Sequence, residues 1–210
     1  MKEILGKKLG MTRIFRETGE SIPVTVIEAG PCVVVDKRTD ERNGYTAYQV
    51  GFGERKKSRV NKPMAGHFAK VDAKPTRYLR EVRVDGEQEY ETGAEVKVTI
   101  FNEGERVDVS GISRGLGMAG GMKRHNFSGA NKTHGQSDRW RAPGSIGQSS
   151  YPSRVFKGIR MAGRMGKDKV TIMNLEVVRI IENENLMLVR GSVPGHKGSL
   201  VKIRSTNRGR

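Results

Sequence analysis

The chain has 210 residues, with 39 Lys or Arg against 23 Asp or Glu, which gives a net charge of +16 and a pI near 10.2. This length allows one good hydrophobic core, or a core with a large insertion. So strong a positive charge is unusual for a small-molecule enzyme, and it favours a polyanionic partner, either nucleic acid or a membrane surface.

The sequence argues against the membrane. It contains no apolar run of about eighteen residues and no basic amphipathic helix. Its first residues, Met1 to Lys8, lack the roughly seven or more apolar residues of a signal-peptide core. We therefore expect a cytosolic chain with no membrane partner.

Short runs rich in β-branched residues recur along the chain, bounded by Gly, Asn, Asp or Pro. Before residue 111 they are Ile22–Glu28, Cys32–Lys37, Tyr45–Phe52, Leu79–Val84, Val96–Phe101 and Arg106–Val109. Near the C-terminus they are Val170–Ile181, Leu186–Gly191 and Ser199–Arg204, joined by turn-like segments at 182–185 and 194–198. The runs are too closely spaced for intervening helices, and barrel closure leaves no exposed strand edge. The sequence therefore predicts a mainly β fold with a small closed or nearly closed β-barrel.

Two local features qualify this pattern. Residues 54–78 interrupt the strand rhythm with a charged run, Glu54–Pro63, followed by Met64–Lys70, and we expect this excursion to contain a short helix. The charged run is either a solvated surface or an RNA contact, and the sequence favours neither. The single cysteine, Cys32, begins the apolar run Cys32–Val35, which indicates a buried structural thiol rather than a reactive one.

Residues 111–170 differ from both flanks. They include twelve Lys or Arg, two acidic residues and twelve Gly, and carry ten of the sixteen net positive charges. Only eight are large aliphatic residues or Phe, too few for a core. We expect a long extended basic loop inserted between strands, so that 1–110 form the first part of the barrel and 171–210 complete it with a C-terminal tail. A local, cationic, core-poor insert points to a nucleic-acid partner.

The insert contains residue types suited to RNA. Cations beside glycines can meet phosphate, His125 and His134 can stack on a base or remain inert, and Trp140 lies in a region with little core to bury it. Val155–Gly166 fits neither a helix nor a regular strand, and we expect it to lie extended along RNA. The expected RNA contacts are Arg114, Lys123, Arg124, His125, Lys132, Arg139, Trp140, Arg141, Lys157, Arg160, Arg164 and Lys167.

Enzymatic alternatives have weak support. Gly115–Gly120 matches G-x-G-x-x-G, but no helix and second parallel strand follow in the pattern that a dinucleotide site needs. No G-x-S-x-G turn supports a nucleophile. The histidines, which are His67, His125, His134 and His196, have no metal-ligand spacing, so we expect no metal, no cofactor and no catalysis. A DNA-binding protein is a further alternative, although no recognition helix or dimerisation heptad is evident.

Several ordered blocks resemble the bacterial form of the large-subunit ribosomal protein L-three family over essentially the whole chain. They are Leu5–Phe15, Asp108–Gly115 with Met122–His125, Arg141–Gly147, Val155–Gly158 with Met161–Gly163, and Val189–Gly195. One departure is Leu116 with Met118, where the family pattern has a Lys and an aromatic residue, so the Gly-rich turn carries one cation fewer.

The resemblance implies a β-barrel at the surface of the large subunit, with a loop that threads into rRNA towards the peptidyl transferase centre. It also implies direct rRNA binding, a role early in subunit assembly and contact with neighbouring ribosomal proteins. Many bacterial relatives carry N5-methylglutamine directly after the Pro-Gly-Ser-Ile-Gly block, a position held here by Gln148. That modification requires a separate glutamine methyltransferase as a further partner.

Overall fold

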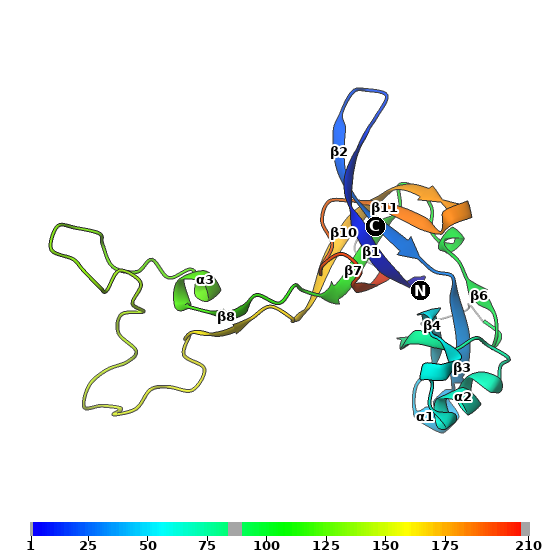
Figure 1. Ribbon diagram of the computed structural model, residues 1–210, viewed down its shortest axis with the longest axis horizontal. Coiled ribbons are helices and arrows are strands. Elements are labelled where there is room, and N and C mark those ends of the chain that lie inside the picture. The colour runs from blue at the N-terminus through cyan, green and yellow to red at the C-terminus, as the bar shows by residue number, and fades with distance from the viewer. Residues whose placement is uncertain (1, 84–89, 207–210) are drawn as a thin grey trace. The chain divides into compact units, whose positions relative to one another are not determined.

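A computed structural model describes residues 2–83 and 90–206 of the chain. The described residues form two compact units, one of residues 2–83, 90–113 and 169–206 and the other of residues 114–168. The first unit holds a closed antiparallel barrel with the strand order β1-β12-β7-β10-β11-β2, which confirms the predicted fold class (Figure 1). These strands are β1 (Glu3–Phe15), β2 (Ser21–Ala29), β7 (Arg106–Ile112), β10 (Lys169–Ile181), β11 (Leu186–Arg190) and β12 (Leu200–Ser205).

A second sheet of four strands, in the order β5-β4-β3-β6, belongs to the same unit. Its strands are β3 (Cys32–Arg38), β4 (Ala47–Glu54), β5 (Thr76–Arg83) and β6 (Glu95–Val96). The sequence pattern predicted these strands without separating them from the barrel. The strand expected at Val96–Phe101 is wrong beyond Val96, because residues Val98–Ile100 form a 3₁₀ turn. Val84, the end of another expected strand, lies outside the described residues.

The long strand β1 was not predicted. Its sequence, rich in Gly and Lys, lacks regular alternation, and its pairing with β2 shifts register between Lys8 and Gly10. A bulge of this kind breaks the two-residue period on which strand prediction relies. Beyond the bulge, β1 and β2 form a hairpin that projects past the barrel (Figure 1).

The helices are short. They are α1 (Asp40–Asn43), α2 (Lys62–Ala69) and α3 (Gly121–His125), and 3₁₀ turns lie at Lys57–Arg59 and Glu182–Glu184. The short helix expected within residues 54–78 is α2, whose first turn is capped by the Asn61 side chain accepting from the Met64 backbone amide. Within the described residues, no helix has the length and apolar character needed to cross a membrane.

One continuous core joins the barrel to the second sheet. It contains fully buried barrel residues such as Ile4, Leu5 and Ile203 together with Tyr48 and Phe52 from β4. A smaller cluster joins Ile22 and Val24 of β2 to Leu188 of β11. Burial of these apolar side chains, at about 25 cal/mol per Å², stabilises the unit.

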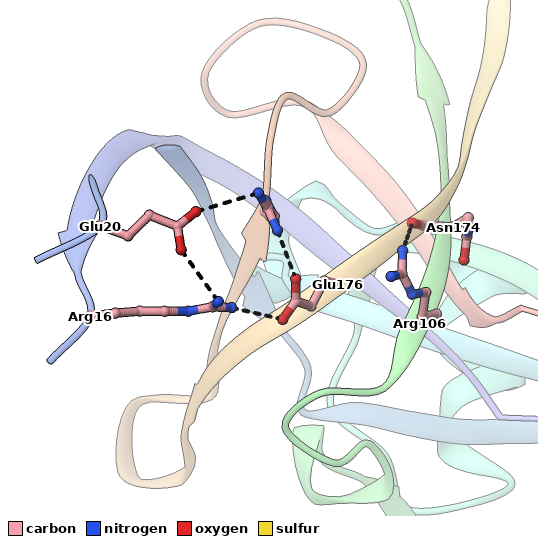
Figure 2. A network of polar contacts seen from close by, with 6 residues as sticks. Arg16, Glu20, Arg106, Asn174 and Glu176 are labelled. Carbon is pink, nitrogen blue, oxygen red and sulfur yellow. Dashed lines mark hydrogen bonds and ion pairs between the residues drawn. The ribbon is translucent and has the colours of Figure 1, made fainter. Parts of the chain in front are cut away.

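A ring of ion pairs fastens the hairpin of β1 and β2 to the barrel wall. Arg16 pairs with Glu20 at 3.5 Å and with Glu176 on β10 at 3.0 Å (Figure 2). Arg190 on β11 closes the ring, at 3.7 Å from Glu20 and 3.3 Å from Glu176. The side chains are partly exposed, so each pair contributes at most about 1 kcal/mol, but four linked contacts fix the direction of the hairpin.

Cys32 is buried in the core, and its thiol donates to the Leu5 carbonyl oxygen at 3.5 Å. Burial raises the pKa of the thiol to about 12. We expect the native chain to react with a maleimide at pH 8 at least about a thousandfold more slowly than the denatured chain, because the thiolate is the nucleophile. Equal rates, measured by mass spectrometry, would contradict the buried-thiol interpretation.

Candidate nucleic-acid interface

The second compact unit is the central part of the basic insert, residues 114–168. Its two ends form a short antiparallel hairpin of β8 (Gly117–Ala119) and β9 (Gly163–Met165). The Leu116 amide extends this pairing by donating to the Met165 carbonyl oxygen at 2.9 Å. The expectation of irregular, extended chain throughout 155–166 is therefore wrong at its end. Three-residue strands rich in Gly carry too little pattern to be predicted.

The hairpin also excludes a dinucleotide-binding role for the Gly-rich motif. Gly115–Gly120 runs through β8, whose partner β9 is antiparallel, and α3 after it has only five residues. A dinucleotide site needs a parallel βαβ unit with a helix whose N-terminus faces the pyrophosphate. These glycines therefore shape a hairpin.

Helix α3, near the start of the insert, is hydrogen-bonded to Met161, near its end. Its Arg124 Nη1 donates to the Met161 carbonyl oxygen at 2.9 Å, and His125 Nε2 lies 3.1 Å from the same oxygen. Both residues were expected to contact RNA, and part of their hydrogen-bonding capacity is used within the protein. Arg124 is exposed and keeps further N–H groups for phosphate, whereas His125 is half-buried.

Trp140 is 40% exposed and takes part in the local fold of the insert. Its indole N–H donates to the Gln136 carbonyl oxygen at 3.1 Å, and its carbonyl oxygen accepts from the Ala130 amide at 3.0 Å. Lys132 Nζ lies 5.2 Å from the ring centroid, in cation–π range. The neighbouring arginines, Arg139 and Arg141, are exposed. The ring is thus held in place while part of it remains accessible.

The expected cationic residues of the insert share one property, which is exposure to solvent. They are Arg114, Lys123, Arg124, Lys132, Arg139, Arg141, Lys157, Arg160, Arg164 and Lys167. None of their side chains forms an ion pair within the described part of the chain. Unpaired, exposed cations are available to replace counterions on a phosphate backbone.

Three of the expected residues line one open cleft of about 880 Å³ within the insert: His125, Arg139 and Arg160. Phe127, Gln136 and the Ala142–Gly144 segment line it as well. The other expected residues are not among those that line it. Sequence reasoning missed Phe127, although an aromatic residue in a core-poor region is the same signal that singled out Trp140.

Exposed aromatic residues form a second feature that the sequence analysis did not identify. Tyr151 is 85% exposed and Phe156 57%, and the Arg154 guanidinium lies 5.7 Å from the Phe156 ring centroid. Large apolar side chains this exposed mark a binding surface. Aromatic rings beside cations are suited to stacking on unpaired bases.

The remaining candidates lie outside the insert or, within it, are not among the residues that line the cleft. His67 Nε2 lies 2.7 Å from the Gln49 side-chain oxygen, and His134 and His196 are exposed. Among residues 2–83 and 90–206, no group of three or more His, Cys, Asp or Glu is placed to hold a metal. Gln148 is exposed and directly follows a turn in which Ser145 Oγ donates to the Gly147 carbonyl oxygen at 2.9 Å.

Comparison with known proteins identifies the family of the chain. The family model described as Ribosomal protein L3 matches residues 82–186. A protein of Carboxydothermus hydrogenoformans is 55% identical over 209 residues, covering 100% of this chain and 99% of the relative. One of Chlorobaculum parvum is 54% identical, covering 99% of this chain and 100% of the relative. Both are named large ribosomal subunit protein uL3. These matches confirm the resemblance found in the sequence, and the chain belongs to the ribosomal protein L3 family.

Proposed function

We propose that this chain is a structural constituent of the large ribosomal subunit, located on cytoplasmic ribosomes, and that it binds large-subunit rRNA directly through the insert. The family consists of structural proteins, not enzymes. The observation that carries the proposal is the charge of residues 111–170, with twelve Lys or Arg against two acidic residues. Each cation that meets a phosphate releases counterions and adds salt-dependent affinity.

The division into two compact units supports a mechanism with two points of attachment. The barrel, stabilised by its own core, docks on one rRNA region and on neighbouring ribosomal proteins. The insert has few core residues, reaches a different rRNA region and extends towards the peptidyl transferase centre. One chain thereby fixes two RNA elements relative to each other, which is useful early in subunit assembly. Peptide-bond chemistry belongs to the RNA in this scheme.

Gln148 is proposed as a modification site, the substrate of a separate glutamine methyltransferase that forms N5-methylglutamine. Its exposure and its position after the Ser145 turn leave the side-chain amide accessible to an enzyme. Intact-mass and peptide mass spectrometry of the chain from its source would show an added methyl group at this residue.

Crosslinking tests the proposed function most directly. We expect the chain from cell lysate to sediment with large subunits and to crosslink, through residues 111–170, to large-subunit rRNA. Sequencing of the bound RNA, together with the sedimentation profile, provides the measurement. Free sedimentation without rRNA crosslinks would contradict the proposal, and a preference for duplex DNA over structured RNA would favour a DNA-binding protein instead.

A further inference from the structure

We propose that the cleft in the insert holds a single unpaired RNA nucleotide, with its base against Phe127 and its phosphate on Arg139 and Arg160. The inference rests on the proposed rRNA binding and names the RNA element that this site takes. The cleft is open, and its volume of about 880 Å³ lies within the range of pockets that hold small ligands and is large enough for one nucleotide with its water.

Phe127 provides the stacking surface. Its ring packs closely on Gly121, where an added Cβ would lie 2.9 Å from the ring, so a side chain at that position would have to displace it. The ring also lines the cleft, where His125 lies beside it with centroids 5.8 Å apart and planes inclined at 35°. An aromatic ring fixed from behind and open in front can stack on any of the four bases.

The polar groups of the cleft match the rest of a nucleotide. Arg139 and Arg160 are exposed cations on its rim, and no described residue that lines it is acidic. A guanidinium group binds a phosphate through two parallel hydrogen bonds. Asn126, Ser128 and Gln136 also line the cleft and offer donors and acceptors to a base edge or a 2′-hydroxyl.

The walls of the cleft are held by hydrogen bonds within the protein. The Ala130 amide donates to the Trp140 carbonyl oxygen at 3.0 Å and the Trp140 indole to the Gln136 carbonyl oxygen at 3.1 Å, which closes the loop between them. Gly129 permits this closure, because a Cβ at that position would collide with the Trp140 carbonyl oxygen. A site shaped before binding loses less conformational entropy when the nucleotide enters.

An unpaired nucleotide fits this site better than a base within a duplex. Bases in A-form RNA are stacked on both faces, and their deep major groove excludes side chains. A base that reaches Phe127 must therefore leave its stack or already lie in a loop, a bulge or a single strand. We accordingly expect one nucleotide in such an element, and no base-paired segment, to contact the cleft.

Chemical probing of rRNA in assembled large subunits tests the inference. In subunits carrying Phe127→Leu, one unpaired nucleotide is expected to become about fivefold or more reactive to 2′-hydroxyl acylation, because its stacking on the ring is lost. Leu retains the apolar packing on Gly121, so the variant separates stacking from folding of the insert. The matched control is Phe15→Leu, an exposed aromatic residue at the end of β1 that is not among those lining the cleft; it should leave that nucleotide unchanged.

Crosslinking of the unsubstituted chain provides a second measurement that needs no variant. Large subunits containing 4-thiouridine should yield a crosslink between one unpaired nucleotide and peptides covering 125–144. Crosslinks from these peptides only to base-paired RNA, or an unchanged probing profile in Phe127→Leu subunits, would overturn the inference while leaving the proposed function intact. Absence of the unsubstituted chain from large subunits would instead refute the proposed function.

Discussion

Deleting residues 120–165 is expected to leave a folded barrel that has lost most of its affinity for large-subunit rRNA. The flanking strands β7 and β10 pair directly at Ile112 and Lys169, so the remaining residues can close as a surface loop. The deletion removes nine Lys or Arg and one acidic residue. If every cation meets a phosphate, the slope of log affinity against log salt falls in magnitude by about 6 to 8. Filter binding between about 50 and 200 mM KCl measures this slope.

Two kinds of variant control this experiment. A full-length chain with the same nine cations replaced by Gln separates charge from chain length, and it should show a similar loss of slope. Single substitutions Arg141→Ala and Lys157→Ala should change the free energy of unfolding by less than about 0.5 kcal/mol, because both side chains are exposed. An unchanged salt slope in the deletion variant would show that the insert is not the main electrostatic contact.

The fold was predictable where apolar residues follow a regular period. Strands β2, β3 and β11 lie within two residues of their expected bounds, because buried Val and Ile alternate or run together between clear turn residues. Strand β1 was missed because a bulge interrupts its pattern. The sequence also did not indicate that β3 and β4 belong to a sheet outside the barrel, because strand pairing depends on contacts distant in sequence.

The sequence predicted which segment of the chain holds the candidate site, but it did not predict how its residues are arranged in space. Charge and glycine content set the insert and its cations apart from the rest of the chain. The sequence could not show that His125, Arg139 and Arg160 line one cleft with Phe127, because that arrangement follows from the bonds of α3 to Met161 and from closure between Ala130 and Trp140. Local sequence patterns carry no record of such contacts.

Strand β7 carries a buried acidic residue, Asp108, between the fully buried side chains of Val107 and Val109. Its carboxylate accepts hydrogen bonds from two other strands. The Asp108 Oδ1 accepts from the Asn174 backbone amide at 3.0 Å, and the Asp108 Oδ2 accepts from Arg204 Nη2 at 3.1 Å. Asn174 lies in the β10 bulge with a φ of 62°, a left-handed conformation that needs support. Arg106 supports the same residue by donating to its carbonyl oxygen at 3.2 Å (Figure 2). Asp108 therefore joins β7, β10 and β12.

Replacing Asp108 by Ala is expected to lower the free energy of unfolding by about 2–3 kcal/mol, because the Asn174 amide and Arg204 lose their charged acceptor. The corresponding fall in melting temperature is about 5–10 °C, measurable by circular dichroism. Asp108→Asn keeps an acceptor for the Asn174 backbone amide and turns a side-chain amide towards Arg204. The free energy of unfolding should therefore fall by less than in Asp108→Ala. Glu17→Ala, an exposed acid in the turn between β1 and β2, controls for the change in net charge. Equal stability of Asp108→Ala and Glu17→Ala would show that the buried carboxylate does not hold the bulge, and that the barrel wall depends on its apolar packing alone.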